Sequence, residues 1–166
     1  MYVSSYLVFL GLVGSLVSNV AANTLYRGDA RGPKIIKEAG GFKAKGFTNP
    51  EGTLFEHVSG LLKHPSRDPF ISTTPDIEVA KGHAGKGYLY TLDETRITEP
   101  KHDVAAEYEK AKKKYPYPKE KEVAVEHLIP WDAVTKVERK IKGVWKSIPL
   151  PKKRAIGFTN DEFFVN

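Results

Sequence analysis

Short strand-like segments alternate with helix-prone segments along this chain, and the alternation has no regular period. β-Branched and aromatic residues, bounded by Gly, Pro and Asp, predict strands at residues 24–27, 70–73, 87–92, 123–125 and 134–141. Apolar residues at helical spacing, with Pro near the start of some segments, predict helices at residues 33–38, 53–63, 75–81 and 103–114. The strand–helix–strand rhythm of a parallel sheet is missing. The pattern therefore predicts an α+β fold.

The chain has no cysteine among its 166 residues. A disulfide framework, a cysteine nucleophile and a cysteine-ligated zinc site are therefore all excluded. Five histidines are present without an H-x-x-x-H pair, so we expect no metal site. Residues 23–166 are long enough for one domain that buries its own core, and the tail from about 149 is left ambiguous.

Residues 1–22 carry no charged side chain and contain an apolar core at residues 6–17. Small residues at Val20, Ala21 and Ala22 follow this core, at the positions that a signal peptidase reads. These features predict a secretory signal peptide and hence a secreted protein. A membrane anchor is the alternative, but it needs about 20 apolar residues. This core is shorter and is interrupted by Gly and Ser, so cleavage is favoured over anchoring.

The formal net charge is +6, and residues 1–22 contribute none of it. Much of the positive charge lies in two runs, at residues 110–119 and 152–154. Exposed lysines usually serve solubility, and they can also steer a protein toward acidic surfaces or anionic ligands. No recognisable nucleic-acid motif accompanies the two runs, so we do not expect nucleic acid as a partner.

Two acidic residues, Glu120 and Glu122, are separated by one residue, between a Pro-rich stretch and a β-like run. In an extended segment, side chains at i and i+2 share a face. Two carboxylates on one face can act together on one small cationic target. Glu-x-Glu alone is common and is mostly solvated surface charge, so its weight depends on the residues upstream.

Arg27, at the end of the first predicted strand, offers a planar fork of donors that suits phosphate or carboxylate. Gly28 allows a ligand to approach the backbone closely. Asp29 is suited either to hold the arginine or to cap the turn. An exposed arginine in a turn is the alternative interpretation of this segment when it is taken alone.

Histidine and hydroxyl side chains supply further candidates. His57, on a predicted helix, can donate a hydrogen bond to a ligand, although a lone histidine is more often structural. Ser72 and Thr73 end a predicted strand, where hydroxyl groups can hold a carboxylate in one rotamer. Thr74 is expected to cap the following helix, and this role does not explain Ser72.

Together these residues resemble the cholera-toxin-like mono-ADP-ribosyltransferases, the heat-labile enterotoxin A-chain family. The order of the motifs carries the resemblance, because each motif alone is weak. The matches are L-Y-R-x-D at 25–29, a helix with a double glycine at 35–41, L-[FY]-x-H at 54–57, S-T-[ST] at 72–74, P-x-P at 116–118, [QE]-x-E at 120–122 and I-P at 129–130. The resemblance covers residues 25–134.

This resemblance implies an ADP-ribosyltransferase fold, with two small, roughly perpendicular β-sheets and flanking helices around an NAD cleft. NAD is then a substrate, and no metal ion is implied. By analogy with the family, the residues expected to contact NAD are Tyr26, Arg27, Gly28, Asp29, His57, Ser72 and Thr73.

The resemblance also implies a role for individual residues at the reaction centre. Arg27 is expected to bind an NAD phosphate and brace the site, and His57 is expected to hold the adenine-side ribose or the backbone near it. Glu122 is expected to be the main catalytic acid, oriented by a hydrogen bond from Ser72. Glu120 is expected to receive the acceptor and, with the other three side chains Arg27, Ser72 and Glu122, completes the catalytic set.

In this family, a Glu at the first position of the [QE]-x-E motif accompanies protein arginine as the acceptor. Glu120 therefore predicts a secreted toxin or effector that transfers ADP-ribose from NAD to an arginine of a target protein, in the cytosol of a target cell. Tyr117, in the Pro-rich loop, is expected to contact that protein. The lack of cysteine and the short tail indicate a monomer without a receptor-binding pentamer. The alternatives are an NAD glycohydrolase or a nucleic-acid base ADP-ribosyltransferase and, least favoured, an inactive basic binding protein.

Overall fold

The fold is that of a computed structural model, which describes residues 24–151. The predicted signal peptide at residues 1–22 and most of the tail lie outside the described residues, so the signal peptide remains a prediction. No helix within residues 24–151 has the length and apolar character that crossing a membrane requires.

Within this part of the chain, nine strands form three sheets, and every strand pairing is antiparallel. The strands are β1 (Thr24–Asp29), β2 (Gly41–Lys43), β3 (Phe70–Thr73), β4 (Tyr88–Asp93), β5 (Lys101–Asp103), β6 (Val123–Glu126), β7 (Leu128–Pro130), β8 (Val134–Ile141) and β9 (Val144–Ile148). The largest sheet has the order β1-β4-β8-β9, the next has the order β3-β6-β5, and β2 pairs with β7. The α+β class is confirmed, with three small sheets in place of the expected two.

Four α-helices and four 3-10 turns connect these strands within residues 24–151. The helices are α1 (Pro33–Glu38), α2 (Leu54–Ser59), α3 (Ile77–Ala84) and α4 (Val104–Lys110). The 3-10 turns are η1 (Pro65–Arg67), η2 (Glu94–Arg96), η3 (Pro118–Glu120) and η4 (Trp131–Ala133). Of the helices, α1 has the bounds predicted from the sequence, since proline in its first turn sets the starting φ and lacks only an amide that would be unpaired there.

Two helices end earlier than predicted. The helix α2 stops at Ser59 because Gly60 takes a left-handed conformation, with φ 69°. The helix α4 stops at Lys110 because Lys112 turns the chain with a φ of 53°. In both cases a left-handed residue ends the helix, although the apolar pattern or the helix propensity of the sequence continues beyond it.

The start of α3 differs from the expectation that Thr74 caps it. Asp76 is the N-cap, and its side chain accepts a hydrogen bond from the backbone amide of Glu78. Thr74 instead remains in β structure, because its backbone exchanges two hydrogen bonds with Tyr26, at 2.8 and 3.0 Å. These two bonds join the end of β3 to β1, so the three-stranded and four-stranded sheets meet at this point.

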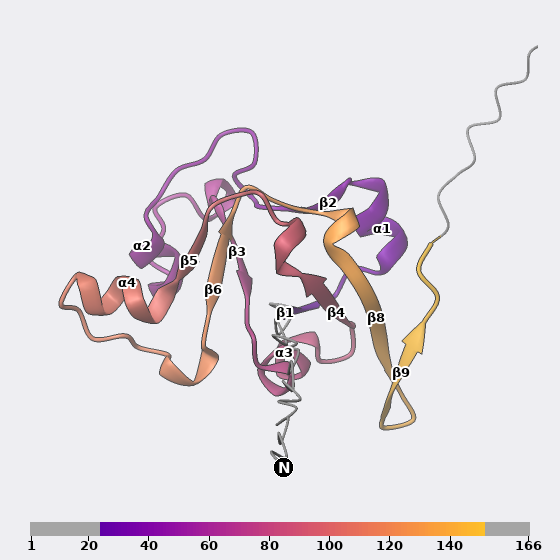
Figure 1. Ribbon diagram of the computed structural model, residues 1–166. Coiled ribbons are helices and arrows are strands. Elements are labelled where there is room, and N and C mark those ends of the chain that lie inside the picture. The colour runs from indigo at the N-terminus through magenta and orange to yellow at the C-terminus, as the bar shows by residue number, and fades with distance from the viewer. Residues whose placement is uncertain (1–23, 152–166) are drawn as a thin grey trace, which may run out of the picture.

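Figure 1 shows the three-stranded sheet with α2 and α4 on one side of the molecule and the four-stranded sheet on the other, with α3 at the lower edge. The main core includes Phe42, Tyr90 and Val137, which are fully buried. A second cluster includes Val104 and Tyr108 of α4, packed against α2. Burial of each large apolar side chain contributes roughly 1.5–3 kcal/mol. The two clusters hold β1, β3 and β6 in place, and these strands carry most of the candidate site.

Gly28 is the position at which α3 packs directly on the backbone of β1. A Cβ atom on Gly28 would lie 2.2 Å from the backbone nitrogen of Ala84 and 2.4 Å from the carbonyl oxygen of Ala80. Both are backbone atoms of α3, so neither can move aside without moving the helix. Gly28→Ala is therefore expected to lower the free energy of unfolding by roughly 2–3 kcal/mol, measured by urea denaturation.

Gly82→Ala is the matched control for this substitution. Gly82 lies in the same helix, and a Cβ atom there meets no heavy atom within 4 Å. Alanine is a better helix former than glycine, so this variant is expected to be as stable as the wild type or more stable. Equal stability of the two alanine variants would contradict the close packing of α3 on β1.

Candidate active site

A cavity of about 490 Å³ lies between β1, the end of β3, α3 and the segment that contains η3. Its volume is within the range of roughly 300–1,000 Å³ that is usual for ligand sites. The residues in its wall that the sequence predicted are Tyr26, Arg27, Gly28, Ser72, Thr73, Tyr117, Glu120 and Glu122. No cluster of three or more His, Asp, Glu or Cys side chains within residues 24–151 is arranged to hold a metal ion.

Glu120 and Glu122 reach this cavity through a turn and not through the extended segment that the sequence predicted. Glu120 is the last residue of η3, which begins at Pro118. Lys121 then takes a left-handed conformation, with φ 46° and ψ 43°. The expected strand-like conformation of the motif is therefore wrong, although both carboxylates do line one cavity.

Arg27 is held between Asp29 and the backbone of β3. Its Nε and Nη2 atoms donate to Asp29 Oδ2 at 3.2 and 3.1 Å, and Nη1 donates to the carbonyl oxygen of Ser72 at 2.7 Å. Burial lowers the pKa of Arg27, and the charge of Asp29 opposes that change. The guanidinium stays protonated because arginine does not lose its proton in proteins. Arg27 thus brings a fixed positive charge to the cavity wall.

Asp29 lies outside the cavity wall and supports Arg27 by accepting its hydrogen bonds, and a contact of Asp29 with NAD stays a prediction. It also accepts side-chain hydrogen bonds from Arg31 at 2.8 and 2.7 Å. Burial would raise the pKa of Asp29, but the hydrogen bonds from Arg31 and the charge of Arg27 outweigh burial and lower that pKa to about 2. The ionised carboxylate therefore fixes the direction of the Arg27 side chain.

His57 lies behind Glu122 and not in the cavity wall. Its Nδ1–H group donates to Asp68 Oδ2 at 2.7 Å. Its Nε2 atom lies 3.1 Å from Ser72 Oγ and 3.2 Å from Glu122 Oε1. The side chains of His57, Asp68 and Glu122 are only 10–12% exposed. Ser72 and Glu122 therefore meet through His57, and a contact of His57 with NAD stays a prediction.

The two neighbouring carboxylates set the charge of His57. Burial would lower its pKa, but hydrogen bonds and charges from Asp68 and Glu122 outweigh burial and raise the pKa to about 9. Burial would likewise raise the pKa of Asp68, and the hydrogen bond from His57 outweighs it and lowers that pKa. At neutral pH an imidazolium therefore sits between the two acids and orients Glu122.

Thr73 links the strand that carries Ser72 to the strand that follows Glu122. Its Oγ1–H group donates to the carbonyl oxygen of Val123 at 2.6 Å. In the β3–β6 register, Thr73 pairs with Val123 and Ser72 pairs with Ala124. This pairing brings the β3 hydroxyls next to the start of β6. It therefore places Ser72 within hydrogen-bond distance of His57, the residue that contacts Glu122.

Two side-chain pairs connect the Glu-x-Glu segment, residues 120–122, to α3 and its N-cap. His83 Nε2 lies 2.6 Å from Glu120 Oε2, and both side chains line the cavity. Lys121 Nζ donates to Asp76 Oδ2 at 3.0 Å. Both pairs are partly exposed to solvent, so they orient side chains more than they stabilise the fold. Glu120 is therefore positioned by a histidine that the sequence did not single out.

Three supporting residues, Arg31, Asp68 and His83, were absent from the sequence-based prediction. Arg31 follows Asp29 by two residues, so an Asp-x-Arg pattern was a usable signal. Asp68 and His83 reach their partners only through tertiary structure: Asp68 follows η1, and His83 lies on α3. No local spacing in the sequence relates Asp68 to His57 or His83 to Glu120.

The sheets and the site together define the ADP-ribosyltransferase fold. Scabin toxin from Streptomyces scabies, solved in complex with NADH, superposes with a TM-score of 0.59 at 27% identity. That match covers 78% of this chain and 74% of the toxin chain. A guanine-specific ADP-ribosyltransferase superposes with a TM-score of 0.57 at 27% identity, over 76% of this chain and 72% of its own.

At the level of sequence, no family model matches the chain. A guanine-specific ADP-ribosyl transferase of Streptomyces coelicolor is 36% identical over 77 residues, which is 46% of this chain. The match spans 35% of that relative, about a third of its length. The relative from Streptomyces coelicolor and one of the two solved structures are named as guanine-specific transferases, and the other solved structure is named as a toxin. The predicted relationship is therefore confirmed for the ADP-ribosyltransferase fold and not for the enterotoxin family.

Proposed function

We propose that this protein transfers ADP-ribose from NAD to a guanine base and releases nicotinamide. The observation that carries the proposal is the cavity shared by Arg27, Ser72 and Glu122, with His57 fixed behind Glu122. Guanine as the acceptor is supported by the specificity of relatives that share the fold. It takes the place of protein arginine, the acceptor first expected from Glu120.

The cavity wall suits the charge of NAD. NAD carries a diphosphate, and a guanidinium fork pairs well with phosphate oxygens. Arg27 is the one Lys or Arg in the cavity wall of the described chain, so we assign the diphosphate to it. The NADH complex of Scabin toxin supports a nicotinamide dinucleotide as the ligand of this fold.

NAD cleavage breaks the bond between ribose C1′ and the nicotinamide nitrogen. The bonding electron pair goes to that nitrogen, so nicotinamide leaves as a neutral molecule and the ribose gains positive charge, as in glycoside hydrolysis. A carboxylate held nearby stabilises this charge more in the transition state than in the ground state. We assign this role to Glu122, because contact with the His57 imidazolium holds its carboxylate in one orientation.

Glu120 suits guanine as well as arginine. The N1–H and amino groups of guanine form a planar pair of donors, and an arginine guanidinium presents a similar pair. A carboxylate can accept both hydrogen bonds in either case, so Glu120 alone does not select arginine. The amino nitrogen of guanine then forms the bond to C1′ and loses one proton to solvent, so Glu120 holds the base in place and does not have to take up the proton.

Glu120→Gln distinguishes between the two acceptors. Guanine is neutral, and the glutamine carbonyl still accepts one hydrogen bond from it, so kcat/KM for transfer to deoxyguanosine is expected to fall no more than roughly 10-fold. Arginine is a cation, so loss of the negative charge is expected to lower any transfer to agmatine at least roughly 100-fold. A fall in kcat/KM of roughly 100-fold or more with deoxyguanosine would contradict the role given to Glu120 in binding a neutral base.

The acceptor is identified by incubating the purified protein with NAD and either deoxyguanosine or agmatine, and measuring the products by mass spectrometry. An ADP-ribosylated product is expected from deoxyguanosine and not from agmatine. Product from agmatine alone would overturn guanine and favour the second candidate, protein arginine, which Glu120 supports. Nicotinamide released without either product would instead indicate an NAD glycohydrolase.

Secretion is a further part of the proposal, supported by the apolar leader at residues 1–22 and by the toxin activity named for Scabin. A secreted form should begin near residue 23. Mass spectrometry of the culture medium of the producing cells tests this, and a protein that stays in the cells with its leader intact would contradict it.

A further inference from the structure

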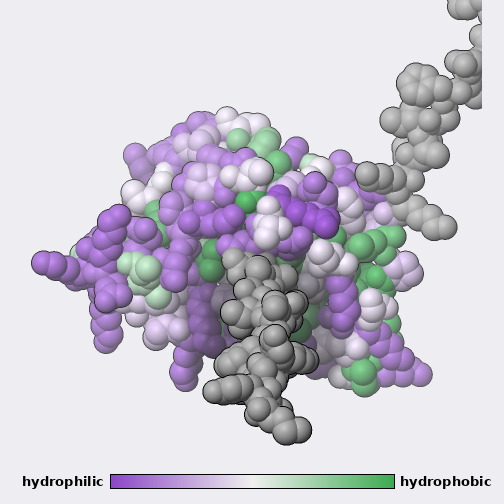
Figure 2. Space-filling model, viewed as in Figure 1, coloured by the Kyte–Doolittle hydropathy of each residue, from purple (hydrophilic) through white to green (hydrophobic). Residues whose placement is uncertain are grey.

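Lysines crowd the segment between α4 and η3. Residues 110–121 contain six lysines and a single acidic residue, Glu120. All six lysines are exposed. Figure 2 shows a largely hydrophilic surface at the end of the molecule where Figure 1 places α4. We call residues 110–121 the basic segment. A run of lysines usually serves solubility. Its contacts with the domain and its distance from the cavity decide whether it also binds a ligand.

The basic segment is packed against the domain. The Tyr115 ring lies on Tyr108 of α4, with ring centroids 5.2 Å apart. Lys113 Nζ lies 4.0 Å from the centroid of the Phe55 ring, a cation–π contact with α2. The two prolines that follow Tyr115 restrict the backbone further. The backbone that carries these lysines is therefore held against the domain.

Lys112 stands where a helix usually ends in glycine. The amide of Lys113 donates to the carbonyl oxygen of Tyr108, and the amide of Lys112 donates to that of Glu109, which is the Schellman pattern. Lys112 takes the left-handed position of this motif, with φ 53°. This conformation disfavours any residue with a Cβ atom, and Lys112 adopts it to end α4.

Four lysines of the basic segment have no ion-pair or hydrogen-bond partner for their side chains within the described chain. They are Lys110, Lys112, Lys114 and Lys119. The one acid of the segment, Glu120, pairs with His83 and not with these lysines. The segment therefore presents uncompensated positive charge to a ligand.

The basic segment continues directly into the cavity wall. Lys119 precedes Glu120 in the sequence, and Tyr117 lines the cavity while 51% of its surface is exposed. An exposed aromatic ring beside basic side chains is the combination that binds single-stranded nucleic acid. Bases stack on the ring, and the lysines meet the phosphates.

We propose that Lys112, Lys114 and Lys119 bind the phosphate backbone of a single-stranded nucleic acid, while Tyr117 stacks on a base beside the guanine that enters the cavity. This proposal rests on guanine as the acceptor, and it adds that a polynucleotide is a better substrate than a free nucleoside. A nucleoside has no phosphate and cannot use these lysines. A single strand also leaves the base edges free to reach Glu120.

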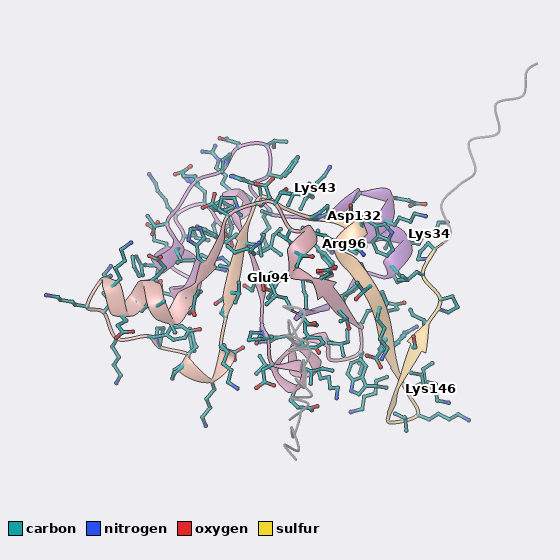
Figure 3. The ribbon with its side chains drawn as sticks, in the orientation of Figure 1. Lys34, Lys43, Glu94, Arg96, Asp132 and Lys146 are labelled. Carbon is teal, nitrogen blue, oxygen red and sulfur yellow. The ribbon has the colours of Figure 1, made fainter. Side chains whose placement is uncertain are left out.

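The test compares two variants with the same change of charge. Lys112→Gln/Lys114→Gln removes two of the proposed contacts. Lys34→Gln/Lys43→Gln removes two lysines that Figure 3 labels in the upper part of the molecule, away from the lower edge where η3 lies. Binding of a fluorescent single-stranded oligodeoxynucleotide with one guanine is measured by anisotropy at several salt concentrations.

The salt dependence gives a quantitative expectation. For single strands, the slope of log K against log salt changes by about 0.7 for each phosphate contact, so Lys112→Gln/Lys114→Gln is expected to lose about 1.4 from the slope. Its affinity at low salt is expected to fall at least roughly 5-fold, whereas Lys34→Gln/Lys43→Gln is expected to bind like the wild type. Tyr117→Leu is expected to weaken binding by roughly 5-fold or more without changing the slope, because stacking carries no charge.

Activity separates this proposal from the proposed function. With NAD, the ratio of oligonucleotide to deoxyguanosine modification is expected to fall at least roughly 5-fold in Lys112→Gln/Lys114→Gln. A wild-type slope and affinity in that variant, or an equal loss in Lys34→Gln/Lys43→Gln, would overturn the lysine surface and leave guanine transfer intact. If the wild-type protein modified neither substrate, the proposed function would fail, and the binding data would still decide the surface.

Discussion

Glu122→Gln is expected to lower the rate of NAD cleavage at least roughly 100- to 1,000-fold, the loss usual when one stabilising group is removed from a reaction centre. The amide keeps the shape of the carboxylate but carries no charge, so it cannot stabilise the positive charge that develops on the ribose. The NAD diphosphate is assigned to Arg27, so NAD binding should change much less than cleavage. The loss should therefore appear in kcat more than in KM, measured as nicotinamide release.

Glu126→Gln is the matched control for this variant. Glu126 ends β6, and it pairs with His102 at 2.8 Å outside the cavity wall. The same loss of charge there is expected to leave the rate close to that of the wild type. Near-normal turnover in Glu122→Gln, or an equal loss in Glu126→Gln, would refute the assignment of the catalytic carboxylate.

Raising the pH from neutral to above 9 is expected to remove the stability that His57 contributes. The pKa of His57 is raised to about 9 in the folded protein by Asp68 and Glu122, against the effect of burial. A raised pKa means that the contribution is fully present below the unfolded value of about 6.5 and is lost as the pH rises through about 9. The difference between the two pKa values corresponds to roughly 3 kcal/mol of unfolding free energy, measured by urea denaturation across this range.

His57→Gln isolates this contribution from the other groups that titrate between pH 6.5 and 9. Glutamine keeps hydrogen-bonding capacity but has no charge to lose, so its stability should vary less with pH by the amount that His57 contributes. It is also expected to be less stable than the wild type at neutral pH, because Asp68 and Glu122 then lack their buried cation. Parallel stability curves for the two proteins would contradict an imidazolium between the carboxylates.

The α+β class and most of the elements could be predicted from the sequence because local patterns determine them. The strand at β3 and the helix α1 follow directly from β-branched residues and from a first-turn proline. Helix ends were less predictable, since a left-handed residue at Lys112 ends α4 where the helix propensity continues. Lysine gives no local signal for that conformation, whereas Gly60 at the end of α2 does.

The residues of the cavity wall were easier to predict from the sequence than the residues that hold them in position. Arg27, Ser72 and Glu122 belong to motifs that occur along the sequence in the order expected for the family. They could therefore be assigned to one cavity before the structure was known. Asp68 and His83 could not, because only tertiary packing brings them to His57 and Glu120. The contact of His57 with Asp68 and Glu122 could not be predicted for the same reason: these partners lie 11 and 65 residues from it in the sequence.

The acceptor was the least predictable part of the function. Glu120 was taken as a sign of arginine, but a carboxylate binds any planar pair of N–H donors, and guanine presents such a pair. Nucleic acid was not expected as a partner of the basic segment, because the sequence contains no recognisable nucleic-acid motif. Its exposed and unpaired lysines beside Tyr117 became visible only in the structure.

The most direct measurement is the release of nicotinamide when the purified protein is mixed with NAD and deoxyguanosine. We predict that nicotinamide and ADP-ribosylated deoxyguanosine form together in equal amounts, since each bond broken at C1′ is replaced by a bond to the base. NAD that remains intact, under conditions in which the protein is folded, would contradict the claim that these side chains form a cavity for NAD cleavage.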